Sequence, residues 1–174
     1  MINSFKIYKK ATKLVQKFGT NNALEIADAL GIKLYYENFE NMLGMYSYRW
    51  KHRLIFLNNN LEDSMLQMVL AHEIGHDIFH RELASNGLKE FALFDIRSIT
   101  EYEANAFAAH LLLKNDDVLS LARAGYDVAQ IASSLNSHIN LLLIKMQEMN
   151  KMGFDFNVPY RAQDNFLKKL ENSN

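Results

Sequence analysis

The sequence predicts an α+β fold that is mostly helical, with a small antiparallel three-stranded sheet and a helical C-terminal part. Apolar residues recur with the helical period of about 3.6 over most of the 174 residues. Three short runs between residues 32 and 57 instead gather β-branched and aromatic residues, as strands do. The hydrophobic share of 49% and the net charge of -1 are those of an ordinary globular protein. One hydrophobic core is expected, because a chain of this length buries roughly 70% of its unfolded surface.

The N-terminal third is expected to hold two helices followed by the three strands. Apolar residues at helical spacing, separated by lysines, predict a first amphipathic helix over 5–18 that stops at Gly19. The same period predicts a second helix over 23–30, which Gly31 ends. The expected strands are 32–36, 44–50 and 53–57, the last two joined by a corner at Lys51 and His52.

Helices are expected to dominate from residue 61 to the end. A long apolar helix begins at Leu61, after an asparagine triplet that can cap it, whereas 82–97 is expected to form a loop. A second apolar helix covers 100–113, and Asp116 and Asp127 have the character of further helix starts. The expected organisation is a core over 1–115 and a helical C-terminal subdomain over 116–174 packed on it, with Pro159 opening the tail.

Composition excludes several kinds of site. The chain has no cysteine, so a metal ion would have to be held by His, Asp or Glu. Lysines interrupt the first twenty residues, so no apolar segment there can act as a signal peptide. No run approaches the roughly 18 apolar residues of a membrane span, and the near-neutral charge gives no general attraction to nucleic acid or anionic lipid. We therefore expect a cytoplasmic protein with no membrane partner and no direct contact with nucleic acid.

The run His72-Glu73-Ile74-Gly75-His76 is an HExxH motif within the predicted long helix. Residues four apart differ by about 40° around a helix axis, so both imidazoles can reach one metal ion. Zinc accepts imidazole nitrogens and lowers the pKa of a bound water to about 7 when one coordination position stays open. Glu73 can take a proton from that water and return it to a leaving amine. The motif predicts a zinc-dependent hydrolase with His72 and His76 as ligands and Glu73 as the base.

The third ligand has to come from another helix. The next apolar helix offers Glu101 and Glu103, which follow His76 by 25 and 27 residues. Glu103 is the preferred ligand, since it precedes small residues that would let its helix pack closely on the HExxH helix. A glutamate on an apolar face is costly unless it is paired or bound to a metal. The alternative is a glutamate at the rim of the helix interface.

Other polar residues are expected to support this centre. Tyr46, Tyr102 and His110 are candidates for stabilising the oxyanion or for supporting the ligands, with plain packing as the alternative. His80 extends the histidine stripe by one turn and is interpreted as a capping or packing residue. The strand segment 44–48 is a candidate rail for an extended peptide, because peptides can add to a sheet edge.

Two stretches of the sequence resemble the ImmA/IrrE family of zinc metallopeptidases. They are Val69-Leu70-Ala71-His72-Glu73-Ile74-Gly75-His76 and Tyr102-Glu103-Ala104-Asn105-Ala106-Phe107-Ala108-Ala109, the second belonging to an E-x-x-A-N-type motif. The resemblance extends more loosely over residues 20–150. His110 and Lys114-Asn115 depart from the acidic or amide residue and the proline expected near the end of the second motif.

The resemblance implies a zincin-like fold with His72, His76 and Glu103 as Zn²⁺ ligands and Glu73 as the catalytic base. Members of the family cut helix-turn-helix transcriptional repressors, often those of mobile elements or stress genes, and thereby relieve repression. The implied partner is therefore a protein substrate of that kind, and the implied activity is that of a site-specific endopeptidase.

Two non-catalytic functions are the alternatives. Segments 128–135 and 139–149 are typical of a helix-turn-helix, yet residues 116–151 carry four acids against three bases, whereas phosphate binding favours a basic face. The other alternative is a binding or regulatory protein that keeps a metal for structure alone. Glu73 argues against it, because a structural site needs no base beside an open coordination position.

Overall fold

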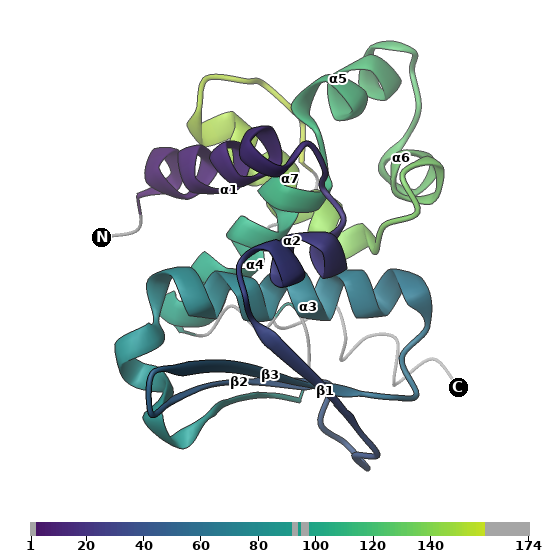
Figure 1. The fold of residues 1–174 in the computed structure, drawn as a ribbon. Coiled ribbons are helices and arrows are strands. Elements are labelled where there is room, and N and C mark those ends of the chain that lie inside the picture. Colours follow the sequence, from purple (N-terminus) through teal and green to yellow (C-terminus); the bar gives the residue numbers. More distant parts are fainter. Residues whose placement is uncertain (1–2, 92–93, 95–97, 159–174) are drawn as a thin grey trace.

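The sheet lies on one side of the long helix α3, and most of the other helices lie on the opposite side (Figure 1). The computed structural model describes residues 3–91, 94 and 98–158, so the predicted tail from Pro159 onward lies outside the described residues. In chain order the elements are α1 (Ser4–Phe18), α2 (Ala23–Ala29), β1 (Lys33–Glu37), β2 (Gly44–Arg49), β3 (His52–Asn58), α3 (Asp63–Phe79), the 3₁₀ helix η1 (Arg81–Asn86), β4 (Leu88–Glu90), α4 (Ile99–Leu112), α5 (Asn115–Arg123), α6 (Val128–Ser134) and α7 (Ile139–Lys151). The mixed α+β class is confirmed.

Helix α1 has the two ends that its sequence predicts. The Asn3 side chain accepts a hydrogen bond from the backbone N–H of Lys6, and Gly19 adopts φ 71° while its N–H bonds to the carbonyl of Val15. The helix buries Ile7 and Ala11 and contacts α4, while its lysines remain on the other face.

The sheet differs from the prediction in strand number and direction. It has four strands in the order β1-β3-β2-β4, and β1 pairs with β3 in parallel. Strands β2 and β3 form the expected antiparallel hairpin, but its turn is at Trp50 and Lys51, which both adopt positive φ as a tight two-residue hairpin requires. The prediction was wrong for β1 because alternation of side chains along a strand fixes its buried face and carries no information about the direction of its neighbour.

The segment expected to be a loop over 82–97 contains η1 and the short strand β4. Strand β4 pairs antiparallel with β2, so that Gly44 is opposite Glu90 and Tyr46 is opposite Leu88. A strand of three residues leaves almost no periodic signal in a sequence, because one alternation is not distinguishable from loop composition.

Helix α3 starts without the predicted asparagine cap. Its N-cap is Glu62, which makes no side-chain capping bond. Asn58 instead holds the preceding loop, since its Nδ2 donates to the carbonyls of Phe39 and Met42 at 2.8 and 2.9 Å. The asparagine triplet therefore organises the approach to the helix without capping it.

Helices α3 and α4 pack closely along small residues. A Cβ placed on Gly75 would lie 3.0 Å from the Cα of Ala104, so a larger residue would push the two helices apart by a few tenths of an ångström. The buried residues of α4 include Ala104, Ala106 and Phe107. This agrees with the expected close packing of the two helices and brings the HExxH helix within side-chain reach of the start of α4.

The C-terminal helices join the same core. Helix α7 packs against α4 and α6 and buries most of its length, including Leu141, Leu142, Ile144 and Met149. The division of the chain at residue 115 stays a prediction. Among the helices of the described residues, none is both long enough and apolar enough to span a bilayer.

Candidate metal centre

The HExxH motif lies in the buried C-terminal half of α3. His72 and His76 are 0% and 2% exposed, and their Nε2 atoms are 3.0 Å apart. One helical turn separates the two residues, which places both rings on the same face. The structure therefore brings the two predicted ligands together with their ring nitrogens converging on one point.

Glu101, in the first turn of α4, completes a group of three potential ligands. Its Oε2 lies 3.2 Å from Nε2 of His72 and 3.5 Å from Nε2 of His76. Within the placed part of the chain, His72, His76 and Glu101 offer one ligand atom each, all within 4.8 Å of one another. The N-cap Ser98 accepts a hydrogen bond from the Glu101 N–H and so fixes where the helix begins.

The structure does not bring Glu103 to the two motif histidines. Its Oε2 lies 3.1 Å from Nε2 of His80, one turn further along α3. Two positions along a helix differ by about 200°, so Glu101 and Glu103 cannot face the same point. The choice between them depends on the rotation of α4 about its axis, which sequence spacing alone does not determine.

Two further side chains set the tautomers of the histidines. Nδ1 of His72 is 2.9 Å from Oδ1 of Asn105, and Nδ1 of His76 is 2.9 Å from Nδ1 of His80. An amide oxygen can only accept, so His72 donates from Nδ1 and presents Nε2 to the centre. If His76 donates to His80 and His80 donates to Glu103, the chain of hydrogen bonds is complete in one direction and also leaves Nε2 of His76 facing the centre.

Asn105 was not among the residues singled out for a role at the site, although the E-x-x-A-N-type motif contained it. The available signal was its position four residues after Glu101, on the same face of α4. His80 was expected to cap or pack, and the structure adds a contact with His76 to that interpretation.

We expect His80→Ala to weaken metal binding without abolishing it. Removing a partner that orients a ligand histidine typically costs 10–100-fold in metal affinity, and His76 would lose the acceptor for its Nδ1–H. Zinc dissociation constants from chelator competition measure the effect. His52→Ala, at an exposed position on β3, is the matched control and should bind zinc as the unaltered protein does; equal affinity in both variants would refute the orienting role.

Glu73 is buried beside the centre without a hydrogen-bond partner for its carboxylate. It is 0% exposed, and neither of its oxygens makes a hydrogen bond of ordinary geometry with a described residue, although the backbone of Tyr46 is near enough to act against the rise of its pKa. Burial raises the pKa of this carboxyl to about 8, although the neighbouring His72 opposes the shift. A Cβ on Gly44 would lie 2.8 Å from Glu73 Oε1, so β2 passes directly over the carboxylate. An unpaired buried carboxylate destabilises the fold, so its presence here calls for a functional explanation.

The charges around the histidines favour a divalent cation. Burial by itself would lower the pKa of His72, but hydrogen bonds with Glu101 and Glu90 outweigh it and raise that pKa to about 10. Burial lowers the pKa of His76 to about 4, while the hydrogen bonds with both histidines hold the pKa of Glu101 far below its usual range despite burial. Carboxylates gathered at buried imidazoles need positive charge, and two imidazoles with one carboxylate form a known donor set of catalytic metal sites.

The other predicted supporting residues have their polar atoms engaged elsewhere. The buried Tyr46 hydroxyl donates to Asp77 Oδ1 at 2.8 Å. The Tyr102 hydroxyl donates to Glu148 at 2.5 Å, and His110 Nδ1 lies 3.0 Å from Lys145 Nζ. Tyr102 and His110 thus belong to a polar network between α4 and α7. An oxyanion role for these three residues stays a prediction.

Lys145 makes this network a source of pH-dependent stability. It is 1% exposed, and burial lowers its pKa to about 7 although the charge of Glu148 opposes the shift. In the unfolded chain the lysine has its ordinary pKa of 10.5. Between these pH values Lys145 binds more protons in the unfolded chain than in the folded chain, so the contribution of Lys145 to stability rises as the pH increases from about 7. The raised pKa values of Glu73 and His72 give contributions that fall with pH in part of the same range.

We expect the contribution of Lys145 to the free energy of unfolding, taken as the difference between the unaltered protein and Lys145→Met, to increase between pH 7 and 9 by up to about 1.4 kcal/mol per pH unit. Lys145→Met should remove this increase, because it deletes the group whose pKa differs between the two states. Urea denaturation at a series of pH values gives the measurement. Lys13→Met, at an exposed position on α1, should give the same pH dependence as the unaltered protein; a difference between the unaltered protein and Lys145→Met that does not change with pH would contradict the assignment.

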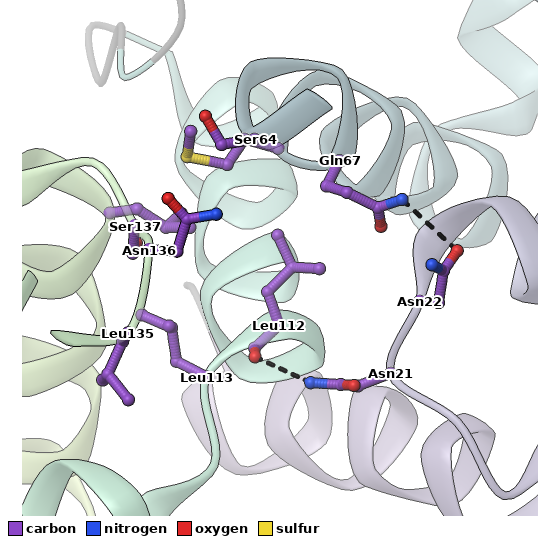
Figure 2. A pocket seen from close by; sticks show the side chains of 11 residues that line it. Asn21, Asn22, Ser64, Gln67, Leu112, Leu113, Leu135, Asn136 and Ser137 are labelled. Atoms are coloured by element: carbon purple, nitrogen blue, oxygen red, sulfur yellow. Dashed lines mark hydrogen bonds between the residues drawn. The ribbon is translucent and has the colours of Figure 1, made fainter. Parts of the chain in front are cut away.

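A pocket of about 240 Å³ lies apart from the metal centre (Figure 2). Its walls come from the starts of α2 and α3, the end of α4 and the α6–α7 turn. The amides in the wall join these elements: Asn21 donates to the carbonyl of Leu112 at 2.9 Å, and Gln67 donates to Asn22 at 3.3 Å. None of the residues that line this pocket belongs to the histidine cluster.

An HExxH helix with a glutamate from a second helix beside the two histidines is the arrangement found in metal-dependent peptidases. The sequence matches the family model described as the IrrE N-terminal-like domain, Peptidase M78, over residues 27–147. The chain therefore belongs to this family, the ImmA/IrrE metallopeptidases.

Two relatives illustrate the range of the match. Metallopeptidase ImmA of Bacillus subtilis (strain 168) is 30% identical over 139 residues, which cover 75% of this chain and 78% of the relative. The "Uncharacterized immunity region protein 2" of Bacillus phage phi105 is 33% identical over 102 residues, which cover 58% of this chain and 64% of the phage protein. The match thus spans less than two thirds of the phage protein.

Proposed function

We propose that the chain is a zinc-dependent endopeptidase. The observation that carries the proposal is the convergence of His72, His76 and Glu101 beside the unpaired, buried carboxylate of Glu73. His72, His76 and Glu101 would hold the zinc ion. Bound there, zinc would supply Lewis acidity, which polarises a peptide carbonyl and makes water a nucleophile at neutral pH.

Glu73 is the proposed general base and acid. Its carboxylate removes a proton from the water that attacks the peptide carbonyl carbon, and it returns the proton to the amide nitrogen as the C–N bond breaks. A carboxyl group that gains and loses a proton within one cycle works best with a pKa near the working pH. Burial raises the pKa of Glu73, and the positive charge of a bound metal ion would lower it again toward the working range.

The proposed substrate is a helix-turn-helix transcriptional repressor in the cytoplasm. Support comes from the similarity to a protein named metallopeptidase ImmA and to a protein of a phage immunity region. Cleavage of such a repressor would relieve repression of a mobile element or of stress genes. The family resemblance supplies this substrate class, and the geometry of the centre is compatible with any extended peptide.

The test is to incubate the purified protein with the repressor encoded beside its gene and to record intact masses. Two new fragments whose masses sum to that of the repressor plus one water are expected with zinc present. The same mixture after removal of zinc by a chelator is the control, and zinc added back should restore cleavage. An intact repressor under all three conditions would refute this substrate.

The DNA-binding alternative has less support from the structure. Helices α6 and α7 are arranged in sequence as a helix-turn-helix, but α7 buries Leu142, Ile144 and Met149 in the core. A recognition helix needs an accessible polar face to enter a groove of DNA. The alternative of a purely structural metal ion does not explain why the Glu73 carboxylate is buried beside the site.

A further inference from the structure

Glu90, the last residue of β4, lies against the proposed metal centre. Its Oε2 is 2.9 Å from Nε2 of His72, the same nitrogen that faces His76 and Glu101. The residue is 6% exposed. A second carboxylate oxygen thus approaches a potential ligand nitrogen from the side of the sheet, whereas Glu101 approaches from α4. This oxygen is not part of the group of His72, His76 and Glu101 atoms that all lie within 4.8 Å of one another, so the Glu90 side chain would move toward them to share an ion.

Strand β4 also covers the edge of β2 that passes the catalytic base. Gly44, Met45 and Tyr46 are paired with Glu90, Lys89 and Leu88. Gly44 is the residue whose Cβ would meet Glu73. An extended peptide that adds to a sheet edge uses the backbone N–H and C=O groups of that edge. On this stretch of β2 those groups face β4.

Together these two observations place Glu90 and β4 where an extended peptide substrate would bind. We propose that Glu90 is a fourth ligand of the metal in a resting form of the enzyme, and that β4 must leave the edge of β2 before a peptide substrate can bind there. The inference rests on the proposed peptidase function and adds to it a resting state with a filled fourth coordination position.

The short length of β4 makes its displacement feasible. A strand of three residues contributes few ladder hydrogen bonds, and short strands have little stability of their own. Lys89 is exposed and Leu88 is half-buried, so little apolar surface holds the strand in place. An incoming peptide would replace the same ladder bonds, and its carbonyl oxygen would take the position of the Glu90 carboxylate.

The first test measures zinc affinity in Glu90→Gln and in the matched control Glu82→Gln, which removes an exposed acid on η1. We expect Glu90→Gln to raise the zinc dissociation constant at least about tenfold and Glu82→Gln to leave it unchanged. Equal affinity in both variants would overturn the fourth-ligand assignment and leave the three-ligand site intact. Absence of zinc from the unaltered protein, even after reconstitution, would instead overturn the peptidase function itself.

The second test fixes β4 to β2 by an engineered disulfide. The chain has no cysteine, and Met45 and Lys89 are directly opposed, which is the arrangement in which introduced cysteines can pair across two strands. In Met45→Cys/Lys89→Cys, oxidation should lower peptide cleavage at saturating zinc at least about tenfold, and reduction should restore it. Intact mass reports how completely the disulfide forms, and elemental analysis checks that the zinc content is unchanged.

Lys89→Cys alone, treated in the same way, controls for oxidation and for the substitution itself. Equal cleavage by the oxidised and reduced double variant would overturn the displacement of β4. Loss of cleavage in the oxidised form with zinc retained would separate this proposal from a failure of the metal site.

Discussion

Replacing Glu73 with glutamine is expected to lower peptide cleavage by roughly 10²–10⁴-fold while leaving zinc binding in place. Glutamine has the shape of glutamate but cannot accept the proton of the attacking water. The metal should remain, because the Glu73 oxygens are not among the three ligand atoms that converge. Cleavage rates and elemental analysis of zinc on the same preparation measure the two effects.

The matched control for Glu73→Gln is Glu82→Gln, which removes one negative charge from the exposed surface of η1. Its cleavage rate should equal that of the unaltered protein. Undiminished cleavage in Glu73→Gln would refute the role of base, and loss of zinc from it would show that the carboxylate holds the metal.

The two glutamates of α4 are expected to differ sharply in their effect on zinc. Glu101→Ala should remove the metal or weaken its binding by more than about 100-fold, because a ligand atom is lost. Glu103→Ala should weaken binding by about tenfold or less, since it removes only the last member of the hydrogen-bonded chain through His80. Zinc stoichiometry and affinity of the two variants, purified identically, give the comparison.

Each of these variants serves as the control for the other, because both remove one carboxylate from the same turn of α4. The opposite result, with zinc lost from Glu103→Ala and kept by Glu101→Ala, would mean that Glu103 is the third ligand, as the sequence analysis predicted. Equal binding by both would mean that neither glutamate coordinates the metal.

Local signals in the sequence predicted most of the helices and the shared helix face of His72 and His76. Gly19 and the residues around Asn3 fix the ends of α1 through backbone hydrogen bonds within a few residues. The pairing of His72 with His76 follows from the helical period alone. These features were predictable because their causes lie within one or two turns of the chain.

Features that depend on a distant partner were not predictable in the same way. Residues 33–37 have the composition of a strand, but their parallel pairing with β3 depends on the path of the chain between them. The approach of Glu90 to His72 depends on β4 reaching the edge of β2. No sequence pattern near Glu90 or His72 predicts that the two side chains meet.

The sequence by itself determined the position of the two histidines and the glutamate of the HExxH motif on one helix, and with them the hydrolytic chemistry that we propose. The tertiary structure showed which glutamate of α4 faces them, since Glu101 and Glu103 are close in sequence and differ in their direction around the helix axis. The order E-x-x-A-N, which begins at Glu101, was the sequence signal for this residue. The packing of α4 on α3 at Gly75 and Ala104 sets that rotation. Packing acts between segments that are distant in the chain, and for that reason spacing alone could not determine it.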